Sequence, residues 1–225
     1  MKIMKKNKFR LGVKMMTICW IFSFLPFCKK KQDANTHMHK TPFEELVQRF
    51  ESPDRDNWQK PEKVLDVLEP LEGKTVLDIG AGTGYFSIRL AKRKAHVLAA
   101  DTDEKFRKYL QERLKKLDAE IASRIHSIAV QPDKIELKQK VDAILIVNVY
   151  HHIDNRVEYL KNLKKLLKPK GVILVVDFFK KELPVGPPVH IKLAKETVMQ
   201  EFKEAGYSLE EEPLGLPYQY VIKAK

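Results

Sequence analysis

The sequence predicts an α/β fold, in which a mostly parallel sheet is covered by helices on both faces. Apolar runs of strand length alternate with amphipathic helical segments from about residue 74 onward, and such alternation favours parallel strands joined by helices. The first apolar run also leads into a glycine-rich turn and a helix start. Ligands of such folds bind at the carboxyl ends of the strands.

Five apolar runs are predicted to be the central strands. They lie near residues 74–79, 95–100, 124–130, 141–147 and 171–178. Two helices are predicted before the first strand, at residues 42–50 and 61–68, and each has a proline in its first turn. Later helices are predicted at 157–167 and 195–205 because apolar residues recur there at helical spacing.

The stretch Thr-Val-Leu-Asp-Ile-Gly-Ala-Gly-Thr-Gly-Tyr-Phe at residues 75–86 carries the strongest functional signal. Its turn holds three glycines, Gly80, Gly82 and Gly84. Glycine suits a backbone that a ligand approaches closely or that needs a positive φ. Asp101 follows the next predicted strand, 21 residues after Gly80, and an acid at this spacing can accept both hydroxyls of a ribose. The two features predict a site for a nucleoside-containing cofactor.

The glycine spacing distinguishes two cofactor classes. A dinucleotide turn reads Gly-x-Gly-x-x-Gly, and the position of its last glycine is Tyr85 here. Asp78, just before the turn, would repel a pyrophosphate but suits a cationic amino group. With these residues the sequence resembles the class I S-adenosylmethionine-dependent methyltransferases, whose first motif is hydrophobic-Asp-x-Gly-x-Gly-x-Gly. The resemblance implies S-adenosyl-L-methionine as the cofactor and methyl transfer as the reaction.

The resemblance assigns cofactor contacts residue by residue. The glycine turn would face the amino-acid part of the cofactor, Asp101 would hold the ribose, and Thr102 would border the adenine. Asn148 follows the fourth strand, where the family lines its cofactor and substrate cleft. The full predicted set is Asp78, Gly80, Ala81, Gly82, Thr83, Gly84, Asp101, Thr102 and Asn148.

The likeness continues in order over roughly residues 60–225, including the Leu-Lys-Pro-Lys-Gly run at 167–171 before the fifth strand. It implies a Rossmann-like, doubly wound, mostly parallel seven-stranded sheet with helices on both faces. Residues 207–212 and 218–223 would supply its closing antiparallel pair, and the two early helices would cover the cleft as a lid. The chain also resembles a bacterial group of predicted methyltransferases that has no assigned substrate.

The fourth strand is followed by three candidate catalytic residues, Tyr150, His151 and His152. A hydroxyl or ammonium acceptor needs a base, and histidine is the usual one near neutral pH. The structural alternative is that one histidine caps the next helix and the other packs. Tyr150 could instead border the methyl group through its ring. No metal site is predicted.

The net charge of +12 arises mainly from the N-terminus. Residues 1–31 contain nine Lys and Arg and no acid, which leaves 33 basic and 30 acidic groups in the rest of the chain. A nucleic-acid-binding domain usually shows a concentrated basic face. We therefore expect a small-molecule or lipid-like methyl acceptor rather than a nucleic acid.

Residues 1–28 resemble a signal peptide or a bacterial lipoprotein segment, with a basic start, an apolar run at 15–27 and Cys28 as the residue to be acylated. Phe27 and the lysines after Cys28 depart from that pattern. We expect a tether at 29–41 and the methyltransferase domain at 42–225. The chain would then be exported and attached to a bacterial membrane, the alternative being a cytoplasmic enzyme.

Two other functions stay open at the level of sequence. A nicotinamide-dependent oxidoreductase has the same fold class, although the glycine spacing and Asp78 disfavour it. A non-catalytic, exported protein that binds a nucleoside cofactor would fit an export signal, because the methyl donor is made in the cytoplasm.

Overall fold

The computed structural model describes residues 34–225, so the predictions for residues 1–28 lie outside the described residues. The unit Gln32–Lys225 is compact. It begins before the expected boundary at residue 42, because helix α1 (Ala34–His39) occupies part of the predicted tether. No helix in the described part of the chain is long and apolar enough to cross a membrane.

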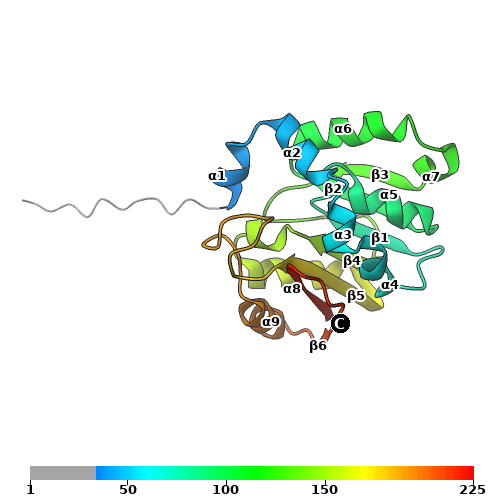
Figure 1. The fold of residues 1–225 in the computed structure, drawn as a ribbon. Helices are drawn as coiled ribbons and strands as arrows, with labels where there is room; N and C mark the ends of the chain where they lie inside the picture. The colour runs from blue at the N-terminus through cyan, green and yellow to red at the C-terminus, as the bar shows by residue number, and fades with distance from the viewer. Residues whose placement is uncertain (1–33) are drawn as a thin grey trace, which may run out of the picture. The chain divides into compact units, whose positions relative to one another are not determined.

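The sheet has seven strands in the order β3-β2-β1-β4-β5-β7-β6 (Figure 1), which confirms the predicted fold. The first five strands in the chain are parallel, and β7 runs antiparallel to both β5 and β6. The strands are β1 (Thr75–Ile79), β2 (His96–Asp101), β3 (Ile125–Ala129), β4 (Val141–Val147), β5 (Leu167–Phe178), β6 (Leu209–Glu211) and β7 (Gln219–Ala224).

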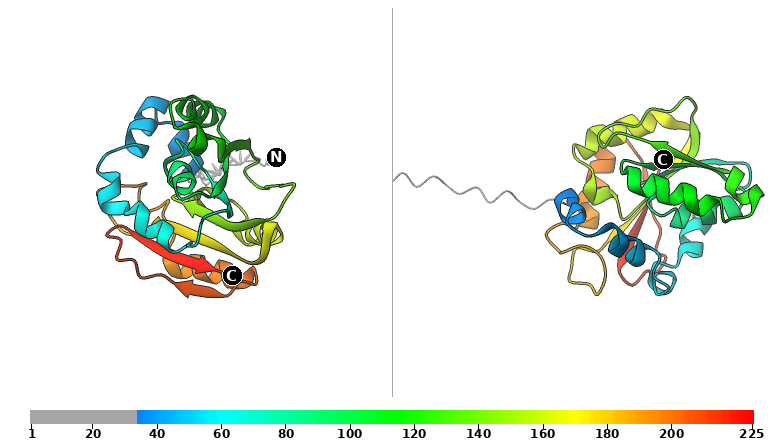
Figure 2. Two further views of the ribbon diagram at one scale, coloured as in Figure 1. Left: turned by 90° about the vertical axis from the view of Figure 1, so that its right-hand side faces the viewer. Right: turned by 90° about the horizontal axis from the view of Figure 1, so that it is seen from above.

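Helices cover both faces of the sheet, as Figures 1 and 2 show. Helices α4 and α5 pack on one face, and α8 and α9 pack on the other. After α1 the helices are α2 (Phe43–Phe50), α3 (Arg55–Gln59), α4 (Pro61–Asp66), α5 (Tyr85–Lys92), α6 (Glu104–Leu114), α7 (Ala119–Ser123), α8 (Arg156–Leu166) and α9 (Lys195–Glu204), with a 3₁₀ turn, η1, at Tyr150–His152.

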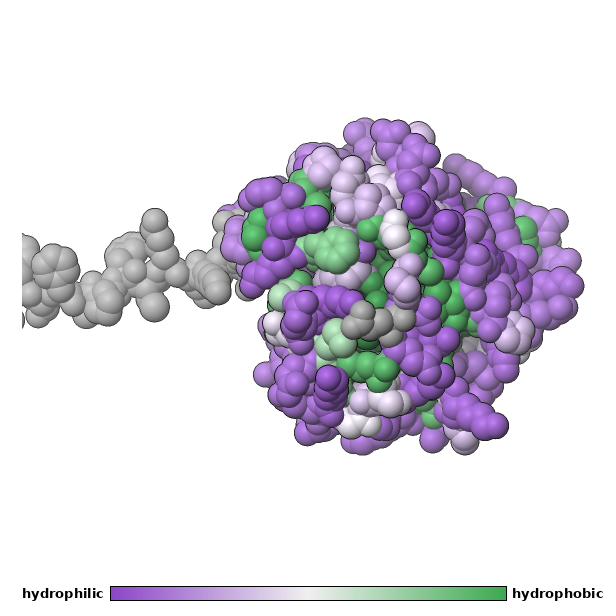
Figure 3. Space-filling model, turned by 60° about the horizontal axis from the view of Figure 1, so that its bottom comes forward, coloured by the Kyte–Doolittle hydropathy of each residue, from purple (hydrophilic) through white to green (hydrophobic). Residues whose placement is uncertain are grey.

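The central strands are apolar at successive positions because both of their faces are buried. In β1, Val76 points into the core under α4 and α5, and Leu77 points into the core under α8 and α9. Both side chains have no exposed surface. The outer surface differs: the face in Figure 3 is mostly hydrophilic, with apolar residues gathered in its middle.

Strand β5 starts earlier than predicted. The Pro-Lys-Gly run was expected to separate helix 157–167 from strand 171–178, but β5 already includes Leu167. Leu167 is buried and pairs with Val141, and regular pairing resumes at Val172 after a register shift. Pro169 has no N–H to donate to a neighbouring strand. The run therefore ends α8 as expected and continues as irregular strand.

A buried polar chain ties the early helices to the sheet. On α3, Arg55 Nε donates to Gln59 Oε1 at 2.5 Å. Gln59 Nε2 then donates to Gln219 Oε1 on β7 at 3.0 Å, and Gln219 Nε2 donates to Asn148 Oδ1. Arg55, Gln59 and Gln219 are all buried. This chain fixes residues 43–66, which we call the lid, against the carboxyl end of β4 and the start of β7.

Replacing Gln59 with Ala should lower the free energy of unfolding by about 1–3 kcal/mol, because buried groups of Arg55 and Gln219 lose their partner. Urea denaturation measures this. Gln200→Ala is the matched control, because Gln200 is exposed and bonds only to Glu204 on its own helix; its effect should stay within about 0.5 kcal/mol. Equal losses in the two variants would contradict the role of the buried chain.

Candidate active site

The glycine turn forms where β1 meets α5, beside the end of β2. The backbone N–H groups of Gly80 and Ala81 both donate to the Ala100 carbonyl, at 2.8 and 3.0 Å. Gly82 has a φ of 54° and Gly80 a φ of 70°, values that side chains other than glycine disfavour. A Cβ on Gly80 would lie 2.4 Å from Val149, so only glycine fits there without a shift of neighbouring atoms.

Asp101 connects the glycine turn to the end of β2. Its Oδ2 accepts from the Gly82 N–H at 2.8 Å, and its Oδ1 accepts from the Asp103 N–H at 2.9 Å. A carboxylate offers about four acceptor positions, so each oxygen keeps capacity for a further donor. Burial raises the pKa of Asp101. Thr102, the predicted adenine neighbour, is exposed beside it.

Asp78 lies buried beneath the turn. Its Oδ2 accepts a hydrogen bond from Ser87 Oγ at 2.6 Å. Burial raises the pKa of Asp78 to about 6, and the nearby charge of Asp101 adds to the rise, whereas Ser87 and Arg55 oppose it. Burial likewise lowers the pKa of Arg55 to about 10. The carboxyl group beneath the turn, that of Asp78, therefore has a pKa close to neutral pH.

The lid covers the turn from above. Carbon atoms of the Phe50 ring, at the end of α2, lie 3.6 and 3.7 Å from where a Cβ on Gly82 would be. Phe50 stacks on Phe106 of α6 with ring centroids 5.5 Å apart. Beside it, the guanidinium of Arg55 lies 3.8 Å from the centroid of the Tyr85 ring. Of the two early helices expected over the cleft, α2 lies beside the turn through Phe50, whereas α4 packs on α5.

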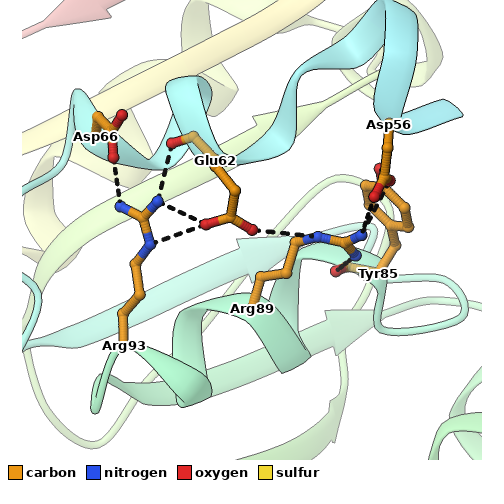
Figure 4. A network of polar contacts seen from close by, with 6 residues as sticks. All are labelled: Asp56, Glu62, Asp66, Tyr85, Arg89 and Arg93. Carbon is orange, nitrogen blue, oxygen red and sulfur yellow. Dashed lines mark hydrogen bonds and ion pairs between the residues drawn. The ribbon is translucent and has the colours of Figure 1, made fainter.

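Charged groups hold α3 and α4 on the surface of α5 (Figure 4). Arg89 forms an ion pair with Asp56 at 2.9 Å, and Asp56 also accepts from the Tyr85 hydroxyl. Arg93 forms ion pairs with Glu62 at 2.6 Å and with Asp66 at 2.8 Å. Because the acidic partners are largely exposed, these pairs stabilise less than their number implies.

A histidine and an aspartate form a close pair at the ends of β4 and β5. His151 Nδ1 lies 2.9 Å from Asp177 Oδ1 and 3.0 Å from Oδ2, and the side chains are 3% and 1% exposed. Asp177 is the last residue but one of β5; the sequence places it at the strand ends with Asp78 and Asp101, but it was not predicted as a catalytic or cofactor-binding residue. Its position at the carboxyl end of the fifth strand is the signal that could have given it a role, because parallel strands bring these ends together.

The other two residues predicted with His151 differ in their surroundings. His152 Nδ1 lies 3.0 Å from Asn35 Oδ1, and Asn35 Nδ2 donates to the His152 carbonyl at 3.1 Å, so α1 contacts η1. The Tyr150 side chain does not border the strand-end site. It is fully buried, and its hydroxyl donates to Glu201 of α9 at 2.8 Å. Tyr150 is therefore a core residue.

The remaining predicted residues lie at the same edge of the sheet. Asn148 adopts a φ of 59° directly after β4 and accepts from Gln219. Thr83 is buried in the turn, and its Oγ1 has no hydrogen-bond partner among the described residues. Within residues 34–225, no group of three or more His, Cys, Asp and Glu could hold a metal ion.

Comparison with known proteins identifies the domain. Residues 77–173 match the family model described as a methyltransferase domain. The crystal structure of an S-adenosylmethionine-dependent methyltransferase from Aquifex aeolicus has a TM-score of 0.73 and 27% identity, over 82% of this chain and 98% of that one. The chain therefore carries a class I S-adenosylmethionine-dependent methyltransferase domain. Its cofactor is S-adenosylmethionine, which replaces the nicotinamide alternative.

Curated relatives at lower coverage act on different acceptors, by their names. A tRNA U34 carboxymethyltransferase from Pseudoalteromonas atlantica is 30% identical over 122 residues, which cover 54% of this chain and 36% of the relative. A ubiquinone biosynthesis O-methyltransferase from Pelagibacter ubique is 27% identical over 126 residues, or 56% and 51%. The chain spans about a third to a half of the length of these relatives.

The residues at the strand ends fit this cofactor. Asp101 keeps acceptor capacity for ribose hydroxyls, and Asp78 places negative charge near a cationic ligand. Within residues 34–225 the buried Thr83 hydroxyl has no hydrogen-bond partner. The Phe50 ring adjoins Gly82, so a ligand on the turn contacts or displaces the lid. Asp78, Thr83 and Asp101 are therefore the residues that we expect to hold it.

Gly82→Ala should weaken S-adenosylmethionine binding by about tenfold, because the added methyl group projects toward Phe50 where the ligand must approach the backbone. Gly73→Ala is a matched control: its φ is also positive, at 71°, but a Cβ there meets nothing within 4 Å. Both variants should lose about 1 kcal/mol of stability from the strained φ. Calorimetric titration that finds equal affinities for the two variants would contradict the site.

The affinity for S-adenosylmethionine should rise with pH through about 6, because the ionised Asp78 attracts the cationic cofactor. Stability should change in the opposite sense. The native state favours protonated Asp78. The contribution of Asp78 to the free energy of unfolding therefore falls as the pH rises from 3.8, the ordinary pKa of the group, to about 6. Calorimetric titrations at several pH values between about 5 and 8, a range that includes this pKa, measure the affinity. Asp78→Asn should flatten this profile, and an unchanged profile would exclude Asp78 as its origin.

Proposed function

We propose that this chain transfers a methyl group from S-adenosylmethionine to a hydroxyl group of a small molecule, with His151 as the general base. The contact between His151 Nδ1 and Asp177, at 2.9 Å, is the observation that carries the proposal. A histidine whose one ring nitrogen is held by a carboxylate keeps the other nitrogen as a defined proton acceptor.

The carboxylate determines which nitrogen of the His151 ring acts as the base. Asp177 accepts a hydrogen bond from the Nδ1–H group of His151. This leaves the Nε2 lone pair to take the proton of the acceptor hydroxyl as its oxygen forms the new bond to the methyl carbon. Asp177 then stabilises the imidazolium that results. When bound, the cofactor would supply the methyl group from its sulfonium; the sulfur–methyl bond breaks, and its electron pair stays on the sulfur, which becomes uncharged. General-base assistance of this kind contributes about 10²–10⁴-fold in rate.

The pair lies in a site that excludes water. His151 and Asp177 are almost completely buried, and α1 contacts η1 through Asn35. Exclusion of water strengthens the electrostatic interactions of the reacting groups and prevents hydrolysis. The acceptor therefore reaches the pair only when neighbouring segments move, and α1, which contacts His152 next to His151, is the candidate.

A small-molecule acceptor is supported by charge and burial. The chain after residue 31 carries only three more basic than acidic groups, with 33 against 30. The base lies beneath the surface, where a small hydroxyl compound can reach it more readily than a folded polymer can. A tRNA acceptor, as in the name of the Pseudoalteromonas relative, is the competing assignment. Export and acylation of Cys28 remain predictions about residues outside the described part of the chain.

His151→Ala should lower kcat for a phenolic acceptor by about 10²–10⁴-fold while leaving S-adenosylmethionine affinity within a factor of about two. The reaction is followed as S-adenosylhomocysteine formed with a panel of phenols, amines and unfractionated tRNA. His126→Ala is the matched control, since His126 is exposed on β3. It should retain the parent rate.

Three results of this assay would count against the proposal. Wild-type activity on tRNA alone would assign the acceptor to nucleic acid. A His151→Ala variant as active as His126→Ala would remove the base. Cofactor binding without turnover of any acceptor in the panel would favour the non-catalytic alternative.

A further inference from the structure

Lys192 is a buried cation near the proposed catalytic pair. It lies in residues 179–194, the segment that leaves β5 directly after Asp177 and Phe178 and leads into α9. In Figures 1 and 2 this segment lies at the same edge of the sheet as α1. Lys192 is only 2% exposed. Lysine is almost never buried to this extent unless its charge is paired.

The ammonium group of Lys192 has fewer partners than it can bind. Its Nζ donates one hydrogen bond, to the carbonyl of Lys181 at 2.9 Å, although an ammonium carries three donors. The Phe178 ring centroid lies 5.9 Å from Nζ, at the outer limit of a cation–π contact. Within the described part of the chain, Lys192 forms no ion pair. A buried charge left in this state destabilises the fold.

Lys192 lies near the catalytic pair, because its Nζ is 5.9 Å from the ring centroid of Phe178, the residue that follows Asp177. Burial lowers the pKa of Lys192, and the charges of Glu182 and Asp177 partly oppose this effect. Asp177 is the carboxylate that holds His151. A ligand group bound at Nζ would therefore lie in the neighbourhood of the base.

The segment 179–194 is also basic. Its one acid is Glu182, against three lysines, Lys180, Lys181 and Lys192. The chain after residue 31 has an excess of only three basic groups in total, with 33 against 30. The excess positive charge of this segment attracts anions toward Lys192.

We propose that Lys192 binds an anionic group, a carboxylate or a phosphate, of a small-molecule acceptor whose hydroxyl group faces His151. This inference rests on the proposed function, because it assigns the other end of the same acceptor. The anion supplies the missing charge partner and accepts the free N–H donors in charge-assisted hydrogen bonds. The burial of Lys192 favours a small acid over the backbone phosphates of a nucleic acid, which remain outside the protein surface.

A binding site of this kind explains why an unpaired charge is retained in the interior. Binding groups often reduce the stability of the free protein. Lys192→Met keeps the length of the side chain and removes the charge, so it should be at least as stable as the parent in thermal denaturation. A purely structural lysine would give the opposite result, since its loss would destabilise residues 179–194.

Gallate and methyl gallate test the proposal, because they share their phenolic hydroxyls and differ in the charge of the carboxylate. Calorimetry in the presence of S-adenosylhomocysteine should show that gallate binds about tenfold or more tightly than its ester, the magnitude expected for one charge-assisted contact. Lys192→Met should remove this preference, and Lys192→Arg should retain most of it. Lys180→Met, at an exposed neighbouring lysine, is the control and should bind like the parent. Lys192→Gln provides a second neutral variant if Lys192→Met does not fold.

The outcomes separate this inference from the proposed function. Equal affinity for acid and ester, no binding of either, or a preference that survives in the neutral variants would overturn the anion site. The small-molecule assignment would be overturned if tRNA displaced gallate from the parent protein and if this displacement became weaker, by the same factor, in Lys180→Met and in Lys192→Met. A preference for gallate without methyl transfer to it would leave the anion site in place and count against His151 as a catalytic base.

Discussion

The contact between Asp101 and the backbone of Gly82 is the constraint on which the cofactor site depends. It joins the end of β2 to the turn after β1, and each of these two strands is fixed by parallel pairing in the middle of the sheet. A side chain at the turn would have to adopt a positive φ and would meet Val149 or the lid. The turn therefore needs both glycine and an acid 19 residues later, and the same acid retains acceptor capacity for a ribose.

The lid and the sheet act together around this turn. Phe50 adjoins Gly82, and the Arg55–Gln59–Gln219 chain continues to Asn148 at the end of β4. The exposed ion pairs between α5 and the lid also hold the lid in place. Each pair contributes less to stability than a buried hydrogen bond does. A ligand that binds the turn therefore acts on a segment whose contacts extend to the edge where His151 and Asp177 lie. This arrangement gives a physical route by which cofactor binding and access of the acceptor can be coupled.

Sequence and structure agree where the signal is local. Asp78, the glycine turn and Asp101 could be predicted because a strand, a turn and a second strand follow one another within 27 residues. The His151–Asp177 pair could be predicted only in part, since it joins residues 26 positions apart whose distance depends on the pairing of β4 with β5. Tyr150 was assigned to the cleft because it follows the fourth strand, but Glu201, 51 positions further along the chain, holds its hydroxyl in the core. Asn35 could not be predicted because its partner is 117 positions away.

The central claim is that the carboxyl ends of β1 and β2 bind an adenosyl cofactor, and a crystal structure with S-adenosylhomocysteine tests it most directly. The account predicts the ligand on the backbone of the glycine turn, its ribose hydroxyls at Asp101, and the Phe50 ring shifted from its place beside Gly82. Crystals grown with the ligand in excess that show Phe50 still against Gly82, and no ligand between Asp78 and Asp101, would contradict the account.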